Sequence, residues 1–212
     1  MRKLERSNIP EPQCLPSYEH GRHTWNDLEP KHKDEIRVHL ELLQGRRCAY
    51  CEGALEELGD HIEHFRTRKR FPKLTFSWRN LYWSCDKTDS CGHFKDNGAG
   101  SYDPDDLIDP CCDDPDVYFL FRANGTISIR SGLTERQQRK ASETLRVFSL
   151  DPEWGRLRKM RMKAVFGYVE DANAAIEEGF GVAELHAYFR DELRATEKQP
   201  FATAIRHVLT ER

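Results

Sequence analysis

The chain has 212 residues and a formal net charge of −3, from 33 basic and 36 acidic side chains. At roughly 150 residues per domain, this length allows one domain with a small appendage. Its 11 Phe, 7 Tyr and 4 Trp exclude the aromatic-poor composition that is typical of disordered chains. No run of about 18 apolar residues predicts a membrane span, and the first six residues (MRKLER) lack the apolar segment of a secretory signal. We therefore expect a soluble cytoplasmic protein without a membrane partner.

The first half of the chain predicts an arm, one helix and a Cys-rich region. Residues 1–30 hold several prolines and few apolar side chains, so we expect an N-terminal arm that packs loosely. Residues 31–44 place apolar side chains at helical spacing and predict a helix that ends near Gly45. Residues 48–95 are rich in Cys, His and aromatic residues with short strand-like pieces, and residues 96–116 predict a loop of Gly, Asp and Pro.

The second half predicts a hairpin followed by helices. Residues 117–130 alternate around Asn124-Gly125, a dipeptide that favours a tight hairpin turn. From Thr134 onward the apolar spacing is helical, with further helices expected over 152–172, 182–195 and 199–210. The predicted organisation is an arm, a central domain, and a helical region that packs on this domain or docks a partner, at 1–30, 31–130 and 131–212.

The charge is unevenly distributed along the chain. Residues 61–95 hold eight basic and three acidic side chains, a balance of +5, whereas residues 96–116 hold eight Asp and no basic residue, a balance of −8. These two blocks cancel in the total, so the net charge does not exclude a nucleic-acid site. The candidate phosphate contacts, whose binding would be salt-sensitive and largely independent of base sequence, are Arg66, Arg68, Lys69, Arg70 and Lys73. A solvated loop is the alternative interpretation of the same run.

Four of the seven cysteines form two pairs, Cys48-x2-Cys51 and Cys85-x5-Cys91. Four thiolates from two separated pairs are the ligand set of a closed, structural Zn²⁺ site. Buried free thiols or a redox-active CxxC pair are the alternatives. The remaining cysteines are assigned no ligand role: Cys14, Cys111 and Cys112.

Several motifs between and beyond these pairs resemble the HNH (ββα-metal) nuclease superfamily. More closely, they resemble the PtuB-like HNH endonuclease subunit of Septu and retron anti-phage systems. The motifs are CAYCE (48–52), IEHF (62–65), WRNLYWSC (78–85), CGHFK (91–95) and the segment 107–127. The resemblance implies an α+β fold: a small zinc-stapled ββα-metal (HNH) core with an added hairpin and surrounding helices.

The resemblance also implies roles for three residues of the first two strands. His64 would be the general base, because imidazole titrates near neutral pH. Glu63 would be an oxygen ligand for a catalytic Mg²⁺ or Mn²⁺ that neutralises the scissile phosphate. Asn80 would orient the catalytic His and its loop through hydrogen bonds.

The third motif departs from the family at one position. The family most often has Asn or His directly after the second-pair Cys, where this chain has Gly92, which carries no ligand atom. His93 is the nearest candidate for metal or phosphate, with Asp96 or Asn97 behind it. Lys95 is expected to neutralise phosphate.

Two acid–His pairs compete for the catalytic position. We prefer Glu63-His64 because IEHF matches the closer family and His64 lies 16 residues before Asn80. Asp60-His61 remains the alternative.

The expected function is a metal-dependent HNH endonuclease that hydrolyses phosphodiester bonds in nucleic acid, with DNA as the expected substrate, in a Septu or retron-type anti-phage system. The resemblance implies an ABC-type ATPase as partner and, in retron systems, a reverse transcriptase with its RNA–DNA product. The chain has no Walker A motif, so ATP would be handled by another subunit. The alternative function is a non-catalytic, zinc-stapled nucleic-acid-binding or adaptor subunit.

Overall fold

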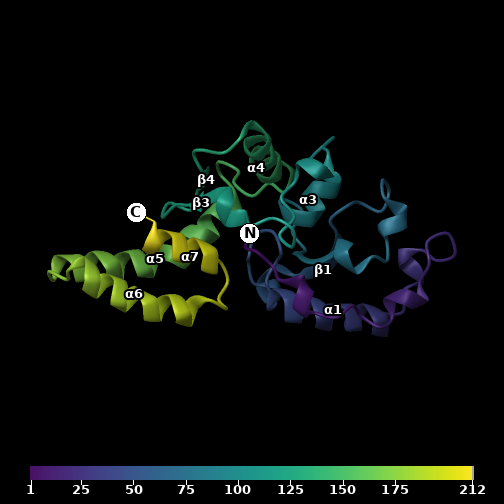
Figure 1. The fold of residues 1–212 in the computed structure, drawn as a ribbon, viewed down its shortest axis with the longest axis horizontal. Coiled ribbons are helices and arrows are strands. Elements are labelled where there is room, and N and C mark those ends of the chain that lie inside the picture. Colours follow the sequence, from purple (N-terminus) through teal and green to yellow (C-terminus); the bar gives the residue numbers. More distant parts are fainter. Residues whose placement is uncertain (212) are drawn as a thin grey trace.

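The structure, a computed structural model, describes residues 1–211 and has mixed α and β composition (Figure 1). Its first sheet joins β1 (Asp60–His64) and β2 (Leu81–Cys85) in antiparallel register, with Asp60 opposite Cys85 and His64 opposite Leu81. The short helix α3 (Cys91–Asn97) follows and contacts β2. Two strands and a helix that are consecutive in the chain therefore form one packed unit.

Helix α1 (Pro30–Gln44) lies beside β2 and ends as predicted at Gly45, whose φ of 63° is left-handed. The buried amide of Gln44 joins three segments: its Nε2 donates to Arg47 O (2.8 Å) and Trp83 O (2.9 Å), and its Oε1 accepts from Trp83 N (2.9 Å). Strand β2 pairs with β1 along one edge, and the Gln44 side chain provides hydrogen-bond partners along the other edge. The one-turn helix α2 (Leu55–Leu58) leads into β1.

The N-terminal residues pack closely, contrary to the loose arm that we expected. Met1, Leu4 and Leu15 are each at most 2% exposed. The Arg6 guanidinium donates to Trp78 O and Leu81 O, both at 2.8 Å. The few apolar residues of this segment are spaced so that each reaches the core, which composition alone does not reveal.

Short 3-10 turns also occur at η1 (Arg6–Asn8), η2 (Leu15–Ser17), η3 (Trp25–Asp27), η4 (Pro72–Leu74), η5 (Trp78–Asn80), η6 (Pro104–Asp106) and η7 (Pro115–Val117).

The predicted hairpin is confirmed as β3 (Phe119–Phe121) and β4 (Ile127–Ile129), with Phe119 opposite Ile129. Helix α4 (Glu135–Val147) follows. It begins with a capping box, in which Thr134 Oγ1 accepts from Gln137 N and the Gln137 side chain accepts from Thr134 N.

Three helices complete the fold: α5 (Arg156–Glu177), α6 (Val182–Thr196) and α7 (Ala202–Thr210). Helix α5 begins four residues later than expected, because Pro152 and Gly155 form a turn (Gly155 N to Pro152 O, 3.1 Å). Helix α7 contacts β3 and α5, whereas α5 and α6 extend to the left of the body in Figure 1. No helix within residues 1–211, the long α5 included, is apolar enough to cross a membrane.

A buried arginine attaches α5 to the rest of the molecule. Arg161 is 2% exposed, and its guanidinium donates to Gly125 O (2.7 Å), Leu150 O (2.8 Å) and the Asp151 carboxylate (2.7 Å). The hairpin turn therefore lies directly against α5. At Gly125, which has a φ of +78°, an added Cβ would lie 2.2 Å from Arg158 O.

We predict that Gly125→Ala destabilises the protein by about 3 kcal/mol, because left-handed strain adds to a collision with α5. Gly132→Ala is the matched control: Gly132 has a φ of +77° but open space around its Cβ position. The control should therefore show only the strain, about 1 kcal/mol. Urea unfolding measures both free energies, and equal losses would contradict the packing of the turn on α5.

Candidate functional site

The two cysteine pairs meet in one buried cluster. The Sγ atoms of Cys48, Cys51, Cys85 and Cys91 all lie within 4.8 Å of one another, and all four residues are buried. The first pair lies in the turn before α2, Cys85 ends β2, and Cys91 begins α3. The cluster therefore joins three separate segments at one point.

The donor set fits a tetrahedral metal ion. Zn–S bonds of about 2.3 Å place sulfurs about 3.8 Å apart, within the observed limit. The backbone N–H of Gly53 donates to Cys51 Sγ at 3.4 Å, a contact that orients a thiolate ligand. Cys91 has a left-handed φ of 59°, and its N–H donates to Phe148 O (2.8 Å). Four buried thiols at these distances can lose their protons to a bound cation, so this cluster could hold a metal such as zinc.

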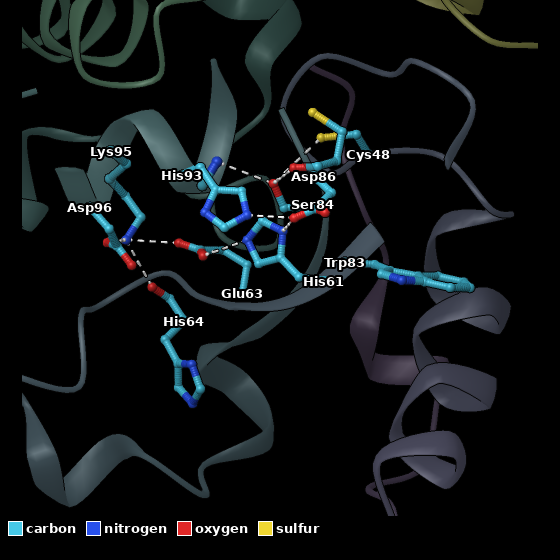
Figure 2. A network of polar contacts seen from close by, with 12 residues as sticks. Cys48, His61, Glu63, His64, Trp83, Ser84, Asp86, His93, Lys95 and Asp96 are labelled. Atoms are coloured by element: carbon cyan, nitrogen blue, oxygen red, sulfur yellow. Dashed lines mark hydrogen bonds and ion pairs between the residues drawn. The ribbon is translucent and has the colours of Figure 1, made fainter. Parts of the chain in front are cut away.

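Strand β1 sends alternate side chains to opposite faces, and this separates both acid–His pairs. His61 and Glu63 lie on the face toward α3, where His61 Nε2 and Glu63 Oε2 are 3.2 Å apart. The Asp60 carboxylate lies on the other face and accepts from Trp83 Nε1 (2.7 Å). The His64 ring likewise lies away from Glu63 (Figure 2). The side chains that meet are therefore those of His61 and Glu63, two residues apart, whereas each predicted acid–His pair consists of adjacent residues.

Glu63 forms a buried ion pair with α3. Its Oε1 lies 2.8 Å from Lys95 Nζ, and the two side chains are 3% and 0% exposed. Burial would raise the pKa of Glu63, but the charge of Lys95 and the hydrogen bond from His61 outweigh it and leave that pKa lowered. Burial likewise acts against the charge on Lys95, whose pKa is nevertheless raised by Glu63 and Asp96. Glu63 is thus a fixed carboxylate at neutral pH.

His61, Asp86 and His93 form a second cluster, with one ligand atom from each within 4.8 Å of the others. His93 Nε2 lies 2.6 Å from Asp86 Oδ1, and the rings of His61 and His93 lie side by side, with centroids 4.2 Å apart (Figure 2). Within residues 1–211, His61 Nδ1 is buried and makes no hydrogen bond. This nitrogen lies 3.8 Å from Asp86 Oδ1, and an imidazole nitrogen that faces a carboxylate is a suitable metal donor.

Gly92 lies where the helix backbone approaches this group. A Cβ at this position would lie 2.6 Å from Glu63 Oε2 and 2.9 Å from His61 Nε2. The Asn or His that the resemblance leads us to expect here would not fit, because the His61 and Glu63 side chains occupy the space beside Gly92. Asp96, in contrast, lies beside Lys95 (2.5 Å) and outside the second cluster.

The loop between β1 and β2 is closed by Asn80. Its Oδ1 accepts from Arg66 N (2.7 Å), and its Nδ2 donates to Arg66 O (3.0 Å) and Leu74 O (3.2 Å). His64 Nε2 donates to Thr75 O (2.9 Å) in the same loop, which leaves Nδ1 as the ring's acceptor. Burial lowers the pKa of His64 to about 4, so its ring is neutral at pH 7.

The five basic candidates of this loop lie in different surroundings. Arg68, Lys69 and Arg70 line a cavity of about 550 Å³ together with Lys95 and Tyr102. Arg66 forms an ion pair with Asp105 of the acidic segment 96–116. Lys73 lines a separate hollow with Glu11 and Phe76. Three of the five candidates thus converge, and they do so next to the ion-paired Lys95.

The sequence interpretation assigned no role to Asp86, and it kept His61 only in the less favoured pair. The period-2 alternation of a strand was the available signal for His61, since it places residues 61 and 63 on one face. Asp86 directly follows Cys85 and is the first residue of the loop that leads from the cysteine cluster to α3.

We predict that the purified protein contains about one zinc ion per chain. Cys48→Ser/Cys85→Ser should remove it and lower the melting temperature by about 10 °C, because binding of a structural metal contributes to folding. Cys112→Ser, at an exposed cysteine outside the cluster, should leave both unchanged. Inductively coupled plasma mass spectrometry and thermal unfolding provide the readouts. Zinc retained by the double variant would contradict the site.

No family model matches the chain. Two curated relatives are each named Septu protein PtuB. The protein from Bacillus thuringiensis is 32% identical over 85 residues, covering 39% of this chain and 31% of the relative. The protein from Bacillus mycoides is 26% identical over 146 residues, covering 56% of this chain and 48% of the relative. The chain is therefore similar to Septu proteins over part of its length, and each match spans less than half of the relative.

Proposed function

We propose that this chain is a metal-dependent HNH endonuclease that acts in a Septu-related anti-phage defence system. The observation that carries the proposal is the meeting of His61, Asp86 and His93 beside Glu63, where the buried His61 Nδ1 makes no hydrogen bond and lies 3.8 Å from Asp86 Oδ1. Lys95, the ion-pair partner of Glu63, lines a cavity together with Arg68, Lys69, Arg70 and Asp96. The similarity to two Septu PtuB proteins supports the setting.

The catalytic cation would be held by His61, Glu63, Asp86 and His93. A divalent ion held by these residues would supply positive charge for the scissile phosphate and the leaving oxygen. Two imidazoles among the donors favour Mn²⁺ over Mg²⁺, which prefers an all-oxygen shell. Compared with the sequence-based ligand set, Asp96 is replaced by Asp86 and His61.

Two other groups have roles around this position. His64 would accept the proton of the attacking water only once its ring turns toward the Glu63 face of β1, because in this structure the ring points away and Nε2 donates to Thr75 O. Its low pKa makes it a weak base in the free protein, and a bound phosphate would raise that pKa. Lys95 would neutralise phosphate from its place beside Glu63.

The proposed partner is an ABC-type ATPase, as the resemblance implies, with a reverse transcriptase and its RNA–DNA product if the system is of the retron type. The substrate is proposed to be DNA. Contacts from Arg68, Lys69 and Arg70 would go to the backbone phosphates and carry no base readout.

We predict Mn²⁺-dependent nicking of plasmid DNA by the purified protein, alone or with its ATPase. His64→Ala should slow nicking about 100-fold or more, because the general base is lost, while Mn²⁺ affinity stays unchanged. His61→Ala should instead weaken Mn²⁺ binding, which isothermal titration calorimetry measures. His20→Ala, at an exposed position, is the matched control.

Equal nicking rates for the wild type and His64→Ala would contradict the role of His64 as the general base. Absence of nicking with Mn²⁺ or Mg²⁺, with and without the ATPase, together with intact DNA binding, would favour the non-catalytic adaptor.

We also predict that Asp105→Asn strengthens DNA binding, because it releases Arg66 from its ion pair. One further phosphate contact should steepen the slope of log affinity against log salt by about 0.9. Fluorescence anisotropy with a labelled duplex at several salt concentrations tests this. Glu178→Gln removes the same charge at the far end of α5, and an equal change there would show a net-charge effect only.

A further inference from the structure

Helix α5 has an outer face that nothing in the described chain covers. A stripe of exposed residues follows the helical repeat along this face: Lys159, Met162, Lys163, Phe166, Gly167, Glu170, Ala174 and Glu177. Near its middle, Phe166 is 58% exposed and Met162 is 46% exposed. Next to them, Gly167 has no atom within 4 Å of its Cβ position. An apolar centre with open space beside it therefore lies halfway along a helix of about 33 Å.

The charges of the stripe are ordered along the helix. Lys159 and Lys163 lie on the N-terminal side of Phe166, and Glu170 and Glu177 lie on the C-terminal side. No ion pair involves these four side chains within residues 1–211 as the structure describes them. This order opposes the helix macrodipole, which favours acidic residues at the N-terminal end and basic residues at the C-terminal end. The pattern therefore does not stabilise α5 by itself.

We propose that the stripe pairs with the same stripe of a second copy of this chain, with the two α5 helices antiparallel. A two-fold axis near Gly167 places Lys163 opposite Glu170 of the second copy, and symmetry repeats the pair. The basic half of each helix then faces the acidic half of the other, and the two macrodipoles also oppose. In this register Lys159 faces Ala174 and Glu177 faces Arg156, so the two reciprocal Lys163–Glu170 pairs are the charge complementarity that selects a second copy as the occupant.

The centre of the stripe suits this arrangement. Phe166 of one copy packs over Gly167 of the other, where the missing side chain lets the helices approach to the usual 8–10 Å. A contact through one helix pair buries less than about 1,000 Å², so the dimer is a weak one. We expect a dissociation constant on the order of 10 µM.

Sedimentation velocity between about 1 and 100 µM protein tests the proposal. The wild type should shift from monomer to dimer over this range. Lys163→Glu and Glu170→Lys should each weaken the dimer about tenfold, because each creates two like-charge pairs. The double variant Lys163→Glu/Glu170→Lys should restore it. Arg190→Glu reverses one charge on the exposed surface of α6 and should change nothing.

A wild type that stays monomeric over the whole range overturns the proposal. A dimer that the single reversals leave intact, or that the double variant does not restore, assigns self-association to another surface and overturns it as well. Circular dichroism of each variant confirms that the exposed substitutions leave the fold unchanged.

Discussion

The meeting of four buried thiols at one point is the constraint on which the rest of the structure depends. β1 and β2 have five residues each, and a two-stranded hairpin of this size is marginal in water. Cys85 and Cys91 lie at the end of β2 and the start of α3, so the cluster determines where the helix begins relative to the sheet. A bound ion would make this geometry part of the folding free energy. The left-handed backbone at Cys91 is the local cost of bringing its sulfur to the same point.

With α3 held in this way, its first turn faces one side of β1. Gly92 lets the helix backbone approach, and His61 and Glu63 occupy the space that a side chain would need. The Glu63–Lys95 pair then lies almost wholly out of water. Burying two charges is costly, and removing one partner leaves the other uncompensated. Such a pair contributes little net stability, but it holds a carboxylate in its charged form at a defined place, which a cation site requires.

Hydrogen bonds and ion pairs also hold the charged loops around this site. Asn80 closes the basic loop through three hydrogen bonds, so the basic side chains project from a fixed backbone. The acidic segment that follows α3 reaches this loop through Asp105 and Arg66, and Arg70 donates to Tyr102 O. The positive and negative blocks of the sequence are therefore also neighbours in space. Two ion pairs, Lys95–Asp96 and Arg66–Asp105, join the blocks, so their charges cancel locally only in part, and Arg68, Lys69 and Arg70 stay exposed beside the cavity.

Local features of the sequence were sufficient for much of the architecture. The helix over α1, the hairpin at Asn124-Gly125 and the grouping of the four cysteines all follow from spacing and turn chemistry within short windows. The packed N-terminal residues and the anchoring of α5 by Arg161 do not, because they depend on contacts with residues far away in the chain. The side chains around Glu63 show the same division. The sequence by itself determined that acidic and His residues occur between the two cysteine pairs. Only the tertiary structure decided that His61, Asp86 and His93 meet beside Glu63 while His64 points elsewhere, because the direction of each side chain depends on which face of β1 the helix α3 covers.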